Sequence, residues 1–370
     1  MSQRIVAVVA GAAFAVGAPA LAPQARAAAR PGHPAGVPVL QDAVSTVAQA
    51  ATVRYWTEAR MAAALRAANG GPTTVKPTTA RAPGVAASAP ALRAVKARRE
   101  VPEPISRKRH LVKRAQPKSP APSGPWLTGN TVGQGLRWTH GGAVTDAVGK
   151  VFFTLGDADY VCSGTLVGGK QADVVLTAAH CVTSGPGQGD VTRWATNWMF
   201  VPGFTNGLMP DGEYTARRFF ATPDWTGPAG GSEQYDVAFV QVTTATPDGV
   251  AGLARPPAGL PVKFAESQGT MPAVRAYVFG YPSEPPYSGL YLTYCAGSVA
   301  AVDGSLRTAC GMTAGDSGGP WLAGFSPRSG TGTVVAVCTY KVSDNLRVLY
   351  GAALGPQARA LYQRAVSSAR

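Results

Sequence analysis

The stretch CGMTAGDSGGP, residues 310–320, places Ser317 among glycines. Such a stretch is either a tight turn, because glycine supplies backbone angles that other residues resist, or the setting of a nucleophilic serine. A serine hydroxyl is a weak nucleophile until a base within hydrogen-bond reach takes its proton and a third group orients that base. The two interpretations are therefore separated by whether a base and an acid stand in suitable places elsewhere.

Histidine is the usual base, and the chain has only four. His33 and His110 fall in an N-terminal region rich in proline, alanine and basic residues, whereas His140 in WTHGG precedes the first clear strand pattern. His180 ends the apolar run VVLTAAHCV. A lone histidine at a strand end is often structural, so His140 and His180 remain as two candidates for the base.

Asp236 in SEQYDVAFVQV is the best candidate for the orienting acid. It opens an apolar strand, so its carboxylate should lie at the edge of a core. The alternative is an aspartate that begins a strand and caps a turn. Asp211, Asp224 and Asp248 lie in loops rich in proline and glycine and are weaker candidates.

The order of these residues excludes two other hydrolase types. The pattern of Gly315, Ser317 and Gly319 also fits the nucleophile elbow of α/β-hydrolases, which requires a histidine after the serine. No histidine follows Ser317 in the chain. An Asp, His, Ser order, as in subtilisin-type enzymes, would require an α/β sheet that the sequence does not indicate. The order His, Asp, Ser remains.

Residues 125–370 have the pattern of an all-β domain. Short runs rich in Val, Phe, Tyr and Thr alternate with clusters of Gly, Pro, Asp and Asn, which is typical of sandwiches and barrels. These runs are KVFFTL, YVCSGTLV, DVVLTAA, WMFVPGF, DVAFVQV, VRAYVFGY, LYLTYCAGSV and GTVVAVCTY. Only the end, GPQARALYQRAVSS, predicts a helix, with Pro356 in its first turn.

The positive charge is confined to the N-terminal third. Residues 1–125 hold 18 Lys and Arg against 4 Asp and Glu, whereas residues 126–370 hold 16 of each sign. No aromatic residue interleaves the basic run RKRHLVKRAQPKSPAPSG, so it lacks a stacking platform for bases and we expect no nucleic-acid partner. We interpret this run as a spacer with dibasic sites, and a polyanion-binding arm is the alternative.

The first 124 residues predict targeting and processing segments. Residues 1–27 have the positive start, apolar core and small residues of a secretory signal peptide, with an uncleaved anchor as the alternative. Residues 28–124 predict a pro-region, with one helix over about residues 40–68 and then a disordered basic linker. We therefore expect a secreted protein without a stable membrane anchor.

Three segments of the β-rich part, TLVGGKQADVVLTAAHC, YDVAFV and GDSGGP, resemble the signature segments of the chymotrypsin-like (trypsin-fold) serine proteases, in particular secreted bacterial members. The resemblance spans residues 150–345 and implies two six-stranded antiparallel β-barrels, with the active site between them. It implies His180 as general base, Asp236 as its orienter and Ser317 as the nucleophile that forms an acyl-enzyme. The backbone N–H groups of Gly315 and Ser317 would form the oxyanion hole.

Five cysteines in an exported chain predict disulfides with one thiol left over. The resemblance implies a Cys162–Cys181 disulfide beside the histidine, and Cys295 and Cys310, fifteen residues apart, are the natural second pair. Cys338, in an apolar strand, would be a buried free thiol. No cysteine or histidine cluster has metal-ligand spacing, so we expect no metal and no cofactor.

The resemblance also places the base of the specificity pocket at Gly311, followed by Met312. Thr339 would lie on one pocket wall and support Asp236 by hydrogen bonding. An aspartate in place of Gly311 would select Arg or Lys, so its absence predicts a small or apolar substrate side chain. No Ile/Val-Val-Gly-Gly tetrapeptide, whose released amino group would pair with Asp316, precedes the first cysteine. A zymogen of this kind needs another partner for Asp316, or uses its pro-region as a spacer or folding aid.

The sequence thus predicts a secreted, monomeric serine endopeptidase that acts on protein or peptide substrates. Two alternatives remain. One is a trypsin-fold protein without activity that binds a ligand or surface through its basic arm, and the other is an esterase with the same triad. The intact triad argues against the first, whereas acyl-transfer chemistry alone does not separate esters from amides.

Overall fold

The computed structural model describes residues 39–68, 134–168, 173–185, 193–227, 231–244, 257–271, 275–342 and 345–367. All of them fall within Val37–Arg370, which pack as one unit. The predicted signal peptide, residues 1–27, and the predicted basic linker lie outside the described residues. None of the helices in the described ranges is long and apolar enough to cross a membrane.

Seven antiparallel strands form the first sheet, in the order β1-β7-β6-β3-β4-β5-β8. Hydrogen bonds between β7 and β8 close six of them into a barrel, and β1 adds a seventh strand beside β7. Every residue of β3 from Val148 to Thr154 is buried, so this strand is covered on both faces. The bounds are β1 Leu40–Ala43, β3 Val148–Leu155, β4 Ala158–Val167, β5 Val174–Thr177, β6 Thr196–Pro202, β7 Tyr214–Ala221 and β8 Ala238–Thr244.

The second sheet has the order β11-β14-β13-β12-β9-β10-β2, and pairing of β10 with β11 joins six of its strands into a barrel-like sheet. Its core includes the fully buried side chains of Met312, Trp321 and Cys338. The bounds are β2 Leu136–Arg137, β9 Arg275–Gly280, β10 Thr293–Val302, β11 Ser305–Ala309, β12 Pro320–Ser326, β13 Thr331–Tyr340 and β14 Val348–Ala353. The predicted class, two antiparallel barrels of six strands, is confirmed, with one extra strand on each.

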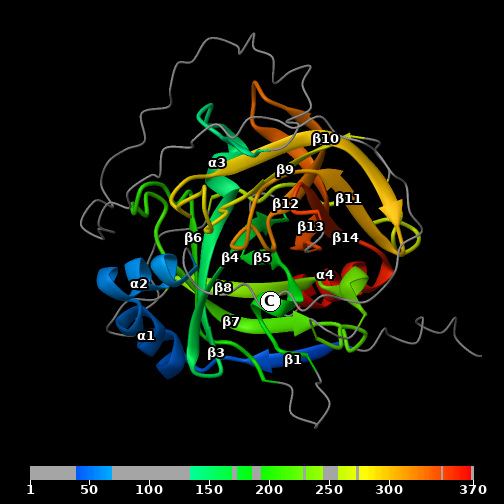
Figure 1. Cartoon of the computed structure of the whole chain (residues 1–370). Coiled ribbons are helices and arrows are strands. Elements are labelled where there is room, and N and C mark those ends of the chain that lie inside the picture. Colours follow the sequence, from blue (N-terminus) through cyan, green and yellow to red (C-terminus); the bar gives the residue numbers. More distant parts are fainter. Residues whose placement is uncertain are drawn as a thin grey trace, which may run out of the picture. The chain divides into compact units, whose positions relative to one another are not determined.

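The predicted C-terminal helix is also confirmed, as α4 Pro356–Ser367. Leu361 is fully buried, and the ring of Tyr362 packs against Phe239 on β8 at 5.5 Å between centroids. The side-chain amide of Gln241 donates to Ala365 O at 2.6 Å, which fixes the helix to the same strand. Figure 1 shows α4 beside the strands of the first barrel.

Residues 40–68 differ from the single helix that the sequence predicted: they form β1, α1 Thr46–Tyr55 and α2 Glu58–Ala68. Ser45 caps α1, since its hydroxyl accepts a hydrogen bond from the backbone of Ala48 at 3.2 Å. The chain leaves the helical conformation at Trp56, where φ is −82° and ψ is 74°. Figure 1 shows α1 and α2 against the first barrel. The remaining described elements are short helices. They are α3 Ala143–Ala147 and the 3₁₀ turns η4 Ala179–Cys181 and η5 Glu233–Tyr235.

Candidate active site

The pairing of β5 with β8 brings His180 and Asp236 together. In this antiparallel pair Thr177 lies opposite Ala238, so the residues that follow β5 are beside those that precede β8. His180 Nδ1 lies 2.7 Å from Asp236 Oδ2, and the His180 backbone N–H donates to Asp236 Oδ1 at 2.9 Å. Asp236 is buried, whereas a quarter of the His180 side chain is exposed.

These contacts decide how the imidazole can act. A carboxylate can only accept, so Nδ1 donates to Asp236 and the other ring nitrogen is left as the acceptor. Burial acts to lower the pKa of His180, but the charge and hydrogen bond of Asp236, with the charge of Asp316, outweigh it and raise that pKa above 6.5. The pair therefore stabilises a positively charged imidazolium once the ring has taken up a proton.

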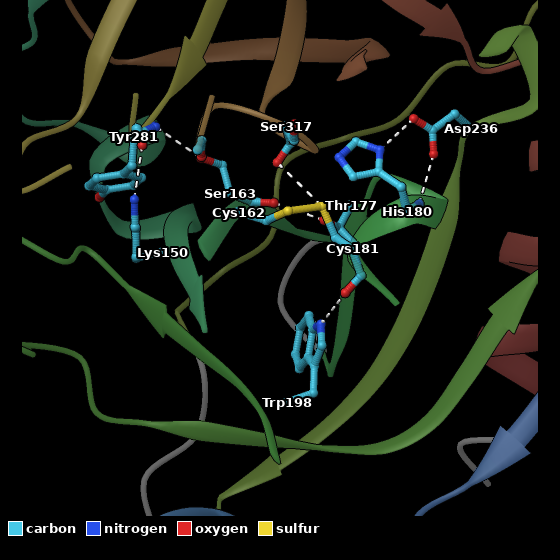
Figure 2. Close-up of a disulfide and its surroundings, with 11 residues drawn as sticks. Lys150, Cys162, Ser163, Thr177, His180, Cys181, Trp198, Asp236, Tyr281 and Ser317 are labelled. Atoms are coloured by element: carbon cyan, nitrogen blue, oxygen red, sulfur yellow. Dashed lines mark hydrogen bonds and ion pairs between the residues drawn. A yellow bond between two sulfur atoms is a disulfide. The ribbon is translucent and has the colours of Figure 1, made fainter. Parts of the chain in front are cut away.

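Ser317 lies in the loop between β11 and β12 and is half-buried. In Figure 2 the ring of His180 lies between Asp236 and Ser317, with its second nitrogen on the side that faces Ser317. The carbonyl oxygen of Ser317 accepts from the backbone N–H of Ser163 on β4 at 2.8 Å. The first barrel thus supplies the histidine and the acid, and the second supplies the serine loop.

The loop that carries Ser317 needs its glycines. Gly315 has φ +100° and Gly318 has φ +79°, values that residues with a Cβ rarely adopt. A Cβ on Gly315 would also lie 2.7 Å from Tyr281 O. Within the described residues, neither the N–H of Gly315 nor that of Ser317 donates a hydrogen bond, so both donors are available.

Ser163 on β4 supports this loop through hydrogen bonds. It was not identified as a site residue from the sequence. Its side chain is fully buried, and its hydroxyl donates to Gly315 O at 2.8 Å while accepting from the backbone N–H of Tyr281 at 2.9 Å. Ser283 adds a further tie, since its N–H donates to Ala314 O at 2.7 Å. Hydrogen bonds from both barrels therefore fix residues 314–317.

Lys150 on β3 is a second residue that sequence reasoning missed. Its side chain is fully buried, and its amine donates to Tyr281 O at 2.9 Å, as Figure 2 shows. The same amine also donates to the hydroxyl of Ser283. Burial lowers the pKa of Lys150 well below its ordinary value, although the nearby charge of Asp316 opposes this. The one signal in the sequence was a single charged residue inside the otherwise apolar strand VGKVFFTL.

Asp316, next to the serine, is also buried. Burial raises the pKa of its carboxyl from 3.8 to about 7, against the opposing charges of Lys341, His180 and Lys150 and a backbone hydrogen bond. Its Oδ2 atom has no hydrogen-bond partner among the described residues. Near neutral pH this carboxyl is therefore a mixture of its protonated and ionised forms.

The residues expected to form the specificity pocket differ in their surroundings. Met312 is fully buried among the apolar side chains of the second core, and Gly311 is partly exposed. The hydroxyl of Thr339 donates to Tyr350 O at 3.2 Å, and no hydrogen bond to Asp236 is present in the described part of the chain. A bulge between Cys338 and Tyr340 changes the register of β13 at this point, which redirects the side chain.

The structure contains disulfides between Cys162 and Cys181 and between Cys295 and Cys310, while Cys338 is a buried free thiol. The first disulfide joins the residue before Ser163 to the residue after His180, as Figure 2 shows. Cys162, His180 and Cys181 lie close enough together to suggest a metal site. Their sulfur atoms are bonded to each other, however, and offer no thiolate to a metal.

The comparisons with known proteins agree with this arrangement. The model of the trypsin-like peptidase domain family matches residues 162–325. The chain is similar to the crystal structure of the protease Anisep from Arthrobacter nicotinovorans, at 31% identity over 64% of this chain and 98% of that one, with a TM-score of 0.51. It is also similar to the thermostable serine protease AL20 from an extremophilic microorganism, at 27% identity over 61% and 99% of the two chains, with a TM-score of 0.51. No curated protein matches the sequence.

Proposed function

The chain belongs to the bacterial chymotrypsin-like serine proteases, and from that premise we propose that it is a secreted endopeptidase that uses His180, Asp236 and Ser317. The observation that carries the proposal is the geometry around His180. One ring nitrogen is bound to a buried carboxylate at 2.7 Å, and the other faces Ser317. A base held in this tautomer can take the serine proton when the hydroxyl attacks a peptide carbonyl.

The first half of the reaction forms the acyl-enzyme. The Ser317 hydroxyl oxygen bonds to the carbonyl carbon, and its proton passes to His180, whose positive charge Asp236 stabilises. The N–H groups of Gly315 and Ser317 donate to the oxygen as it gains negative charge. His180 then gives the proton to the leaving amine as the peptide bond breaks.

The second half repeats these roles with water as the nucleophile. His180 takes a proton from the water as it attacks the acyl carbon, and returns it to Ser317 when the ester bond breaks. The half-exposed position of Ser317 and the partial exposure of His180 are consistent with access for both substrate and water. No step in this scheme requires a cofactor.

The substrate preference that we propose is a neutral side chain beside the cleaved bond. No carboxylate stands at Gly311 or Met312 to hold an Arg or Lys side chain. The amine of Lys341 is already bound, since it donates to Cys310 O at 2.7 Å and to Leu346 O at 2.6 Å. A panel of peptides that differ only at this position, with Ala, Leu, Arg or Glu, would measure the preference through kcat/KM.

The test of the proposal is labelling of the secreted protein with a fluorophosphonate, followed by mass spectrometry of peptides that it cleaves internally. We expect labelling and cleavage in the wild type and neither in Ser317→Ala or His180→Ala. Ser298→Ala, which changes an exposed serine on β10, is the matched control and should behave as the wild type. Labelling that persists in folded Ser317→Ala would contradict the nucleophile, and cleavage of esters but not of peptides would contradict the endopeptidase.

A further inference from the structure

Residues 39–68 are built into the first sheet. Strand β1 pairs with the second half of β7 over four positions, from Leu40 opposite Ala221 to Ala43 opposite Arg218. The next residue continues the contact, because Val44 N–H donates to Arg217 O at 2.9 Å. On the same sheet β6 pairs only with Tyr214 and Thr215 at the start of β7. The segment therefore supplies the hydrogen bonds that β6 leaves open on this edge.

Trp56, at the break between α1 and α2, anchors the segment in the core. Its side chain has no exposed surface, its ring lies 5.5 Å from that of Phe152 on β3, and its indole N–H donates to Asn197 O. Met61 and Leu65 on α2 are buried in the same apolar cluster. Removing the segment would expose these three side chains and the part of the barrel that they cover.

Polar contacts add to this anchor at the β3–β4 hairpin. The hydroxyl of Tyr55 donates to Asp159 Oδ1 at 2.8 Å, and Arg60 Nε lies 3.6 Å from Asp159 Oδ2. The Arg60 guanidinium also lies over the Tyr55 ring, 3.9 Å from its centroid. None of these contacts involves His180, Asp236 or Ser317.

The sequence between this segment and the barrels offers many sites for proteases. Residues 69–133 separate Ala68 from the first described residue of the barrels, and they include the basic run RKRHLVKR. The segment itself contains no cysteine, so no disulfide can tie it to the rest of the protein. Its fate after a cut in the linker depends only on the non-covalent contacts described above.

We infer that residues 39–68 are a permanent part of the folded protease, which stays bound as a separate chain after cleavage in the linker. The segment completes a strand edge and buries a tryptophan, a methionine and a leucine in the barrel core, so its release would expose an open strand edge and apolar side chains to water. The surface formed by β3, β4, β6 and β7 is therefore a binding surface for this segment of the same chain.

The experiment uses the full chain with Ser317→Ala, so that self-cleavage plays no part and the result does not depend on the proposed function. The run RKRHLVKR is replaced by the recognition sequence of a site-specific protease, and the purified protein is cut there. We expect both fragments to elute together on native size exclusion and to separate only in urea. A small fragment that elutes alone under native conditions overturns the inference.

Two substitutions on the segment test the contacts. Trp56→Ala should speed release of the cut fragment by at least about tenfold, because it removes a fully buried anchor. Val47→Ala is the matched control on α1, since Val47 is 74% exposed, and its release rate should equal that of the parent. Equal release rates in the two variants overturn the inference.

A milder variant keeps the test open if Trp56→Ala does not fold. Tyr55→Phe removes only the hydrogen bond to Asp159 and should speed release by about threefold. Amide hydrogen exchange in the cut protein gives an independent readout. Among β7 residues 218–221, the alternate amides point toward β8 and do not report on β1, whereas those that point toward β1 should stay protected while β1 remains paired. Exchange of these amides at the rate of an open strand edge overturns the inference.

Discussion

Ser163→Ala tests the support of residues 314–317 separately from the proposed catalytic residues themselves. The substitution removes one hydroxyl that donates to Gly315 O at 2.8 Å and accepts from Tyr281 N–H at 2.9 Å. The backbone of Ser163 keeps its own bonds, to Ser317 O and from the hydroxyl of Thr177, each at 2.8 Å. The loop therefore remains attached to β4 but loses the bond that sets the orientation of Gly315.

Two effects of different size follow. The hydrogen bond partners on Gly315 and Tyr281 are buried, and leaving each one unpaired costs about 1–3 kcal/mol, so the free energy of unfolding should fall by about 2–6 kcal/mol. Complete loss of one oxyanion donor lowers kcat by about 100- to 1000-fold. Partial misorientation of the Gly315 N–H should lower kcat by about 10- to 100-fold. KM should change little, because the donor acts mainly on the charge that develops in the transition state.

The assay is steady-state kinetics on a peptide substrate, with urea unfolding of the same preparation. Thr165→Val is the matched control, because Thr165 lies on the same strand, is fully buried and has no hydrogen-bond partner for its hydroxyl among the described residues. It should leave kcat unchanged and stability unchanged or slightly higher. A Ser163→Ala protein with wild-type kcat would refute the positioning argument, even if it were less stable.

Three further changes test the site. Because the pKa of His180 is raised, kcat/KM should reach half its maximum above pH 6.5. Asp236→Asn should remove that shift of the midpoint. A wild-type midpoint at or below pH 6.5 would contradict the raised pKa of His180. The folded chain keeps the Asp316 proton up to about pH 7, whereas the unfolded chain loses it near 3.8, so stability should fall as pH rises between these values. The expected loss of stability is on the order of 4 kcal/mol, and it should be absent from Asp316→Asn when urea unfolding is measured across this pH range. An unchanged dependence of stability on pH in this variant would contradict the raised pKa of Asp316. Gly318→Ala places a Cβ 2.5 Å from a backbone oxygen of β4 and should lower the free energy of unfolding by about 2–4 kcal/mol. Gly324→Ala, which has φ +58° but open space around the added Cβ, should lower it by less. Equal losses of stability in the two variants would contradict the packing argument.

The parts of the fold that the sequence predicts are those with local patterns. Short strands between turn residues predict an all-β sandwich or barrel, which the resemblance to the trypsin-fold proteases narrows to two barrels, and the apolar face of residues 356–367 predicts α4. The pairing of His180 with Asp236 is a contact across 56 residues, but each residue lies beside a strand whose pattern is clear. Strand pattern and residue order leave His140 and His180 as candidates for the base, and the resemblance of the three signature segments is what points to His180 and Asp236.

Other parts depend on contacts that no local pattern reveals. The bond from Lys150 to Tyr281 O spans 131 residues, and the bond from Ser163 to Gly315 O spans 152. The break at Trp56 has a similar cause, since the indole N–H finds its partner at Asn197, 141 residues away. A helical pattern over residues 40–68 cannot show that a tertiary hydrogen bond and a buried ring interrupt it.

The charges around Asp316 bear on how the serine loop is held. In the described residues the opposing charges are carried by the side chains of Lys341, His180 and Lys150, and these do not bring the pKa of Asp316 back to its ordinary range. Lys150 itself is bound to neutral oxygens, and burial lowers its pKa. A buried ion pair would require both groups to be charged and closely paired. Among the described residues, the loop is therefore held by hydrogen bonds between neutral groups at Ser163 and Ser283 rather than by an ion pair of Asp316.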